Sequence, residues 1–211
     1  GEPGYIWLDN ARTRGRMKDG KRDDDLNVAG FNPCVEQQLE DAELCCLVET
    51  FPAKHESFDD YLATLKVAYL YGKTVTLVNT HWPETNSIML KNRRIGLSQS
   101  GVVQAFSKHG RRKMFEWCDK SYKHVKELDK HYSNWLCVPR SVRMTSIKPS
   151  GTVSLLNGST PGIHFPEDEY YIRRIRFSDT SELLSPLKKA GYKMEKDAYS
   201  PNTTVVEFPV K

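Results

Sequence analysis

The chain has 211 residues, of which 38% are hydrophobic and 27% charged, and its formal net charge is +4. This balance is typical of a folded globular protein and excludes a disordered or fibrous chain. No run approaches the ~18 apolar residues that a membrane helix needs, and no signal segment opens the sequence, so we expect a cytoplasmic protein. The mild positive charge suits an anionic ligand, whether nucleotide phosphates or a nucleic-acid backbone.

The five cysteines include an adjacent pair, Cys45 and Cys46. An odd number without regular spacing is not typical of a secreted disulfide scaffold, so we expect reduced thiols. The CxxC spacing and neighbouring histidines that indicate zinc are missing, and we predict no metal site. The chain begins with Gly1, and its opening residues are typical of the middle of a protein. We therefore expect truncation at both ends.

The first elements predicted along the chain are a short strand over residues 4–8 and a polar loop over residues 10–26. The sequence then becomes compact, and Asn32-Pro33 is a strong turn signal because a residue before proline avoids the helical conformation. Cys34 is therefore predicted on a constrained loop.

The middle of the chain alternates between strand and helix patterns. Residues 42–50 form an apolar run of strand length, whose two adjacent cysteines would face opposite sides of a sheet. Ser57 is a favourable N-cap, and apolar residues follow it at helical spacing until Gly72, which predicts a helix that ends there. Residues 74–79 are typical of a strand, and residues 111–131 are typical of a second helix with one apolar stripe.

The last third of the chain begins with a predicted strand over residues 142–147. Residues 148–165 then form a loop that is rich in glycine and small hydroxyl residues. Two more strands are expected at residues 171–177 and 203–210. Strands that alternate with long helices indicate an α/β architecture with a largely parallel sheet.

The first candidate site is the turn that carries Asn32, Cys34 and Glu36, since an amide, a thiol and a carboxylate lie within five residues. A turn that contains proline holds these groups near one point, which favours catalysis. The alternative is a cysteine that acts as a small buried hydrophobic residue beside a turn asparagine. Cys45 and Cys46 follow on a segment that can return beside this loop, and their alternative is a structural pair in the core.

The second candidate site is the segment PSGTVS, which follows a predicted strand and precedes a possible helix. Its backbone N–H groups and hydroxyls suit a phosphate group. The residues that could bind it are Ser150, Gly151, Thr152 and Ser154. A second glycine-rich loop over residues 158–162 is a weaker candidate. The Walker pattern is absent, and the alternative is an ordinary connection from strand to helix.

Together and in this order, these motifs resemble the catalytic subunit of ribonucleotide reductases. FNPCVEQQL is similar to the finger loop of that family, and the similarity continues in NRRIGLSQSG, KPSGTVSLLNGSTPGIHF, YYIRRIRFSD and NTTVVEFPVK. The most similar branch is the monomeric, adenosylcobalamin-dependent class II, which acts on ribonucleoside triphosphates. The implied fold is α/β, part of a ten-stranded α/β barrel with an internal finger loop, and residues 1–211 would form one partial barrel domain.

The resemblance also implies a role for each site residue. Cys34 would be the thiol that the 5′-deoxyadenosyl radical of adenosylcobalamin converts to a thiyl radical, which then removes the 3′ hydrogen of the ribose. Glu36 would act as general base on the 3′ hydroxyl, and Asn32 would hold the ribose hydroxyls. Cys45, in preference to Cys46, would be one cysteine of the reducing pair. The substrate phosphates would bind to Ser150, Gly151, Thr152 and Ser154.

Parts of the family pattern are missing from this sequence. They are the second cysteine of the reducing pair, the C-terminal cysteines that take electrons from thioredoxin, and the allosteric region. We therefore expect this chain alone to be inactive. The partners that the resemblance implies are a ribonucleoside triphosphate, thioredoxin or a similar dithiol, and a nucleotide effector that binds outside this segment.

Two alternatives remain at this point. One is the large subunit of a class I reductase, whose radical comes from a metal-containing partner protein. The other is a non-catalytic module that binds nucleotides or nucleic acid, which the net charge and the alternating arginines of residues 173–177 would favour. The class III branch fits less well, because it uses formate in place of a cysteine pair.

Overall fold

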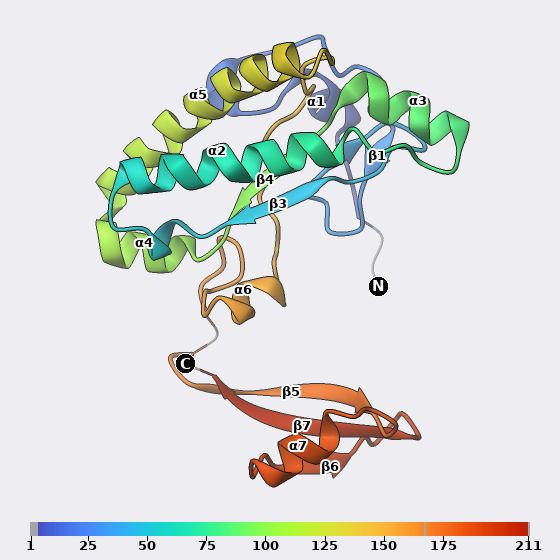
Figure 1. The fold of residues 1–211 in the computed structure, drawn as a ribbon, viewed down its shortest axis with the longest axis vertical. Helices are drawn as coiled ribbons and strands as arrows, with labels where there is room; N and C mark the ends of the chain where they lie inside the picture. The colour runs from blue at the N-terminus through green and yellow to red at the C-terminus, as the bar shows by residue number, and fades with distance from the viewer. Residues whose placement is uncertain (1–3, 167, 211) are drawn as a thin grey trace. The chain divides into compact units, whose positions relative to one another are not determined.

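The computed structural model describes residues 4–166 and 168–210, and the chain divides into two compact units between Phe165 and Pro166 (Figure 1). The first unit combines helices with short parallel strands, and the second unit is built on a small antiparallel sheet. Among the described residues, no helix is both long and apolar enough to cross a membrane.

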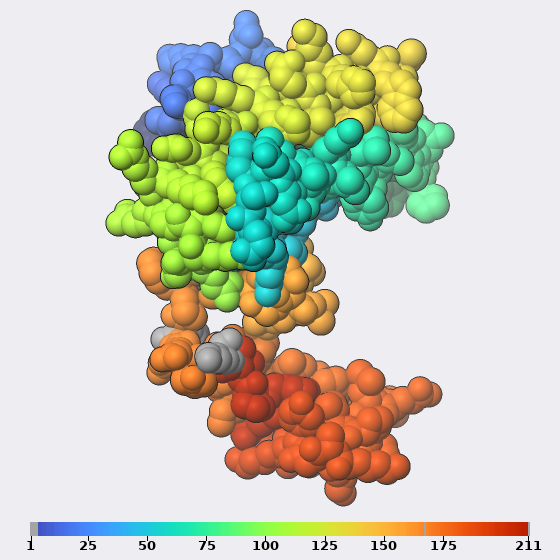
Figure 2. Space-filling model, turned by 60° about the vertical axis from the view of Figure 1, so that its left-hand side comes forward, coloured from blue at the N-terminus to red at the C-terminus, as the bar shows by residue number. Residues whose placement is uncertain are grey.

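The centre of the first unit is a pair of parallel strands, β3 (Leu47–Thr50) and β4 (Gly96–Gln99). Leu97 of β4 also forms a parallel bridge to Thr145. Two long helices, α2 (Phe58–Val75) and α5 (Arg111–Trp135), pack over one face of these strands (Figure 1). The two helices also pack against each other (Figure 2).

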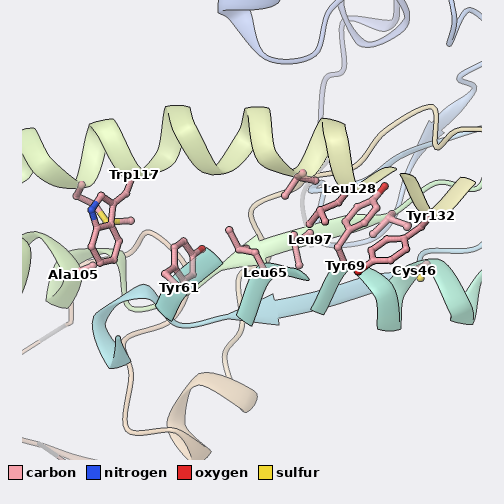
Figure 3. Packing of buried hydrophobic residues seen from close by; sticks show 12 residues of the cluster. Cys46, Tyr61, Leu65, Tyr69, Leu97, Ala105, Trp117, Leu128 and Tyr132 are labelled. Carbon is pink, nitrogen blue, oxygen red and sulfur yellow. The ribbon is translucent and has the colours of Figure 1, made fainter. Parts of the chain in front are cut away.

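The core of the first unit lies between the two long helices and the sheet (Figure 3). Its buried residues are Cys46, Tyr61, Leu65, Tyr69, Ile95, Leu97, Ala105, Met114, Trp117, Val125, Leu128 and Tyr132. Burial of such side chains is the main favourable contribution to folding, at roughly 1.5–3 kcal/mol for each large one. One face of the sheet is therefore committed to the core, and the opposite face is available for a site.

Helix α2 begins as predicted, because the Ser57 hydroxyl accepts a hydrogen bond of 3.2 Å from a backbone N–H of the first turn. The predicted end at Gly72 is wrong, as is the predicted strand over residues 74–79, since the helix continues to Val75. A Cβ on Gly72 would lie 3.0 Å from Val48 Cγ2 and 3.2 Å from Ile95 Cγ2. Glycine is therefore used at this position for close approach to the sheet and does not end the helix.

The N-terminal region also differs from the prediction. The strand predicted over residues 4–8 is not formed, and the predicted polar loop contains α1 (Leu8–Thr13) and a short 3-10 helix, η1 (Met17–Asp19). Arg12 Nε donates to the Val28 carbonyl at 2.9 Å, and an Arg143 side chain donates to the Ala11 carbonyl at 2.9 Å. These long-range hydrogen bonds stabilise the helix. They could not be predicted from the local sequence pattern, because their partners are distant in the sequence.

Several other elements lie outside the predicted set. They are the 3-10 helix η2 (Pro52–Lys54), α3 (Pro83–Asn92), α4 (Val102–His109), α6 (Val153–Leu156), α7 (Leu184–Lys189) and the strand β6 (Met194–Lys196). Helix α3 starts with Pro83 in its first turn and ends at Asn92, and the next residue, Arg93, adopts the left-handed conformation. The strand predicted over residues 142–147 is reduced to the single bridge at Thr145.

The second unit contains β5 (Tyr171–Ser178), β6 and β7 (Thr203–Val210), in the order β5-β7-β6. Both pairings are antiparallel, so the two predicted strands are confirmed, but the expected parallel sheet is restricted to the first unit. The α/β content of the chain is as predicted. The sheets of the described residues have two or three strands.

Candidate active site

The predicted site begins with a hairpin of β1 (Gly30–Phe31) and β2 (Gln38–Leu39). The Asn32 N–H donates to the Gln37 carbonyl at 3.1 Å, and the Gln37 N–H donates to Asn32 Oδ1 at 3.0 Å. The Val35 N–H donates to the Asn32 carbonyl at 2.9 Å and closes a tight turn, with Val35 in the left-handed region. Cys34 lies at the exposed tip, so its predicted position on a constrained loop is confirmed.

The hairpin is attached to the sheet face that the helices leave open. A Cβ on Gly96 would lie 1.9 Å from Gln37 Nε2 and 2.5 Å from Leu47 Cδ2, so the Gln37 amide occupies the space above this glycine. Successive residues of a strand face opposite sides, and Leu97 belongs to the core. The Ser146 hydroxyl also donates to the Glu36 carbonyl at 2.7 Å.

The strand predicted over residues 42–50 forms only as β3 (Leu47–Thr50), so the adjacent cysteines lie directly before it. Their side chains nevertheless point to opposite sides, as predicted. Cys46 is buried in the core, and its thiol lies 3.6 Å from the Gly72 carbonyl. Cys45 is on the hairpin side, where Asn32 Nδ2 lies 3.7 Å from its sulfur. The structure therefore brings Asn32 together with Cys45 and leaves Cys46 on the far side.

The electrostatics of Cys45 connect it to the other site residues. Burial of its thiol, together with the charges of Glu36, Cys46 and Cys34 and against the opposing charge of Lys148, raises the pKa from 9.0 to about 11. At neutral pH, Cys45 is therefore a protonated thiol that retains its hydrogen.

Glu36 supplies a carboxylate to the same face. Its Oε2 atom is buried and has no hydrogen-bond partner within the part of the chain that the structure describes. A buried polar atom without a partner is uncommon and calls for an explanation. An oxygen in this state can accept a hydrogen bond from the hydroxyl of a ligand.

The predicted phosphate loop is a tight turn that leads into α6. The Ser154 N–H donates to the Ser150 hydroxyl at 3.1 Å, and the Ser154 hydroxyl donates to the Ser150 carbonyl. The two serines therefore stabilise the loop itself, and Ser150 adopts the left-handed conformation. Gly151 and Thr152 lie at the exposed surface of the loop.

Sequence reasoning missed the groups that attach this loop to the sheet. The Lys148 N–H donates to the Ser98 hydroxyl at 2.7 Å, and Lys148 Nζ lies 3.4 Å from Glu49 Oε2. Ser98 and Gly96 share one face of β4, since they are two residues apart. The hairpin and the phosphate loop are therefore attached to the same face of the same strand. Cys45, Leu47 and Glu49 are spaced two residues apart, and this spacing was the signal in the sequence that could have placed Glu49 on the same side as Cys45.

The remaining predictions concern metals and the binding of nucleic acid. Within residues 4–166 and 168–210, no group of three or more His, Cys, Asp or Glu side chains gathers as a metal site would require. In the arginine-rich strand β5, Arg174 pairs with Glu195, and Arg176 pairs with Asp197. Two of the arginines that favoured a nucleic-acid module thus already have acidic partners within their own unit.

Comparison with known proteins gives a consistent result. No protein-family model matches the chain. The chain is 54% identical over 211 residues to a probable adenosylcobalamin-dependent ribonucleoside-triphosphate reductase of Dictyostelium discoideum. It is 51% identical over 212 residues to the adenosylcobalamin-dependent ribonucleoside-triphosphate reductase of Euglena gracilis. These matches cover 100% of this chain but only 28% and 29% of the relatives.

The structural comparison agrees with the sequence comparison. The crystal structure of a B12-dependent class II ribonucleotide reductase matches with a TM-score of 0.87 and 36% identity, over 100% of this chain and 33% of that chain. The resemblance predicted from the motifs is therefore confirmed along the whole chain. The chain spans about a third of the proteins that it matches.

Proposed function

We propose that this chain, homologous throughout to one segment of adenosylcobalamin-dependent ribonucleoside-triphosphate reductases, carries the thiol and phosphate-binding parts of such an active site. The reaction would reduce ribonucleoside triphosphates to 2′-deoxyribonucleoside triphosphates for DNA synthesis. One observation supports this proposal above all: the hairpin of Cys34 and the loop of Ser150 are attached to one face of β4. A single nucleotide could therefore contact both.

Each residue of the hairpin site has a task that its surroundings suit. Cys34, at the exposed tip, would carry the thiyl radical that removes the 3′ hydrogen of the ribose. Glu36, whose Oε2 has no partner among the described residues, would accept the proton of the 3′ hydroxyl. Asn32 would hold the ribose hydroxyls, and Cys45, protonated at neutral pH, would provide reducing equivalents.

The phosphate loop would bind the triphosphate through its outer surface. Thr152 is exposed there, and the hydrogen bonds between Ser150 and Ser154 would keep the loop in a binding shape. Gly162, in the second glycine-rich loop over residues 158–162, adopts a positive φ and lies against the backbone of Lys148. A Cβ on Gly162 would lie 2.6 Å from the Lys148 carbonyl oxygen. This contact would hold the two glycine-rich loops together.

Adenosylcobalamin, which the names of the relatives specify, would supply the 5′-deoxyadenosyl radical when it is bound. The chain's own residues fit this requirement, since the Cys34 thiol is exposed at the hairpin tip and can be reached from outside the sheet. Thioredoxin or a similar dithiol would regenerate the reducing cysteines, and effectors would bind to parts outside this segment. A cytoplasmic location would follow from such partners.

The same proposal accounts for the small sheets. Strands β3 and β4 and the segment around Thr145 would be neighbouring strands of a ten-stranded α/β barrel, with the hairpin as its finger loop. Parts of the relatives that lie outside the matched segment would complete it.

The test is a chimera in which residues 1–211 replace the matching segment of the Dictyostelium relative, which is 54% identical. We expect reduction of ribonucleoside triphosphates that requires adenosylcobalamin and no second subunit. Cys34→Ser should abolish turnover and retain nucleotide binding, whereas Cys46→Ser, on the core side, should retain turnover if the protein folds. Turnover of the Cys34→Ser chimera at the parent rate would refute the catalytic assignment.

A further inference from the structure

Side chains at the junction of β4 and α4 hold the second glycine-rich loop by its backbone. The Ser100 hydroxyl, directly after β4, accepts a hydrogen bond of 3.2 Å from the Gly162 N–H. In the first turn of α4, Gln104 Nε2 donates to the Gly158 carbonyl at 3.3 Å, and Gln104 Oε1 accepts from the Thr160 N–H at 3.1 Å. The position of this loop is therefore set by the end of β4 and the start of α4.

The phosphate loop is attached to the same strand and contacts the second glycine-rich loop. The Lys148 N–H, just before the phosphate loop, donates to the Ser98 hydroxyl at 2.7 Å. Gly162 has a φ of +47°, and a Cβ there would lie 2.6 Å from the Lys148 carbonyl oxygen and 3.4 Å from that of Pro149. The two loops thus meet through backbone atoms, at a place where only glycine fits.

Glu49 of β3 contacts the supports of both loops. It is the partner of Ser98 in the parallel register of β3 and β4. Glu49 Oε1 accepts a hydrogen bond from the Ser100 hydroxyl, and Glu49 Oε2 lies 3.4 Å from Lys148 Nζ. One carboxylate therefore joins the hydroxyl that holds the second glycine-rich loop to the residue that begins the phosphate loop.

The exposure of these side chains indicates what loss of the carboxylate would do. The Glu49 side chain is only 6% exposed, and a carboxylate at such a position is stable because both of its oxygens have partners. The Lys148 side chain is 27% exposed, so water can hydrate its ammonium group if Glu49 is replaced. Removal of the carboxylate should therefore loosen the two loops without leaving a buried charge unpaired.

We propose that Glu49 is a positioning residue for the substrate phosphates: through Ser100 and Lys148, it fixes the two glycine-rich loops relative to each other before the nucleotide binds. Backbone N–H groups bind phosphate tightly only when they are already in place, because ordering a loop on binding costs affinity. The role in phosphate binding rests on the proposed function, whereas the fixation of the loops does not.

The first experiment measures amide hydrogen exchange of Gly162 by NMR in the full chain and needs no turnover. We expect Glu49→Ala to speed this exchange about tenfold, because the Ser100 hydroxyl loses the acceptor that orients it. Glu49→Gln should restore most of the protection, since its amide oxygen can accept from Ser100. The Gly96 N–H, which donates to the Cys46 carbonyl at 2.8 Å, should keep its parent rate in both variants.

The exchange rates decide whether Glu49 fixes the loops. Parent exchange at Gly162 in Glu49→Ala would overturn the proposal. So would equal acceleration at Gly162 and Gly96, because it would show that the whole unit had lost stability.

The second experiment uses the chimera and separates positioning from a general loss of structure. Glu49→Ala should raise the KM for the ribonucleoside triphosphate about tenfold and leave kcat within about threefold of the parent. A lower kcat at the parent KM would overturn the proposal, because it would indicate only a smaller amount of active enzyme. Lys108→Met removes an ion pair with Glu56 elsewhere in the unit and should leave both constants unchanged. The Cys34→Ser chimera tests the proposed function separately, since it leaves Glu49 intact.

Discussion

A single glycine determines how closely the thiol hairpin approaches the sheet. The Gln37 amide occupies the space where any larger residue at position 96 would place its Cβ. Glycine is used here for close approach, because no positive φ is required at this position. The location of Cys34 thus depends on a residue far from it in the sequence.

We predict that Gly96→Ala displaces the hairpin and lowers the free energy of unfolding by about 1–3 kcal/mol, as an overpacked contact does. Urea denaturation of the full chain measures this. The matched control is Gly30→Ala in the hairpin itself, where a Cβ would have no neighbour within 4 Å. That variant should change the stability by less than about 0.5 kcal/mol. Equal losses in both variants would show that the contact with Gln37 is unimportant.

At the same scale, the sequence predicted much of the candidate site. The turn signal placed Cys34 correctly, and strand alternation placed Cys45 and Cys46 on opposite faces. It did not predict that Ser150 and Ser154 bind each other, or that Lys148 pairs with Glu49. Such contacts depend on how distant segments of the chain are arranged in the fold, and a local sequence pattern does not predict that arrangement.

The two long helices are joined by a buried ion pair as well as by apolar contacts. Lys73 Nζ lies 2.8 Å from Asp129 Oδ1, and the Tyr69 hydroxyl donates to the same oxygen at 2.8 Å. The Ser141 N–H donates to both oxygens of Asp129 at 3.2 Å. Burial lowers the pKa of Lys73, which is opposed by the carboxylate, so the pair depends on both partners.

We predict that Asp129→Ala lowers the free energy of unfolding by about 3–5 kcal/mol, because the fully buried Lys73 ammonium group would lose its counter-charge. Lys123→Met is the control: it removes a pair with Asp119 on the same helix, but the Lys123 side chain is 69% exposed. Its effect should be within about 1 kcal/mol. A loss for Asp129→Ala as small as that of the control, in urea denaturation, would contradict a stabilising role for the pair.

Among the helices and strands, some were predicted correctly from the sequence and others were missed. Helices α2 and α5 and strands β5 and β7 carry strong periodicity, and they were found. Helix α1 was missed because its stability comes from arginine side chains distant in the sequence. The end of α2 was misplaced because Gly72 serves packing and does not terminate the helix.

On the scale of the whole molecule, the chain corresponds to one segment of the longer proteins that it matches. It matches about a third of its relatives, and its two parallel strands with one bridge do not close a sheet within the described residues. The α/β class was predictable from the alternation of strands and helices. The division into two units was not predictable, because the sequence around Phe165 and Pro166 does not resemble a flexible linker.

The central claim is that the Cys34 thiol and the phosphate loop open to the same side, where one nucleotide could bridge them. Crosslinking tests it most directly, in a full chain whose other cysteines are serine and that carries Thr152→Cys. A flexible bis-maleimide of about the length of a ribonucleoside triphosphate should join Cys34 to position 152 within one molecule. It should not join Cys34 to Lys120→Cys on α5, the helix that packs over the opposite face. Labelling of both thiols at positions 34 and 152 without any crosslink would contradict the shared site.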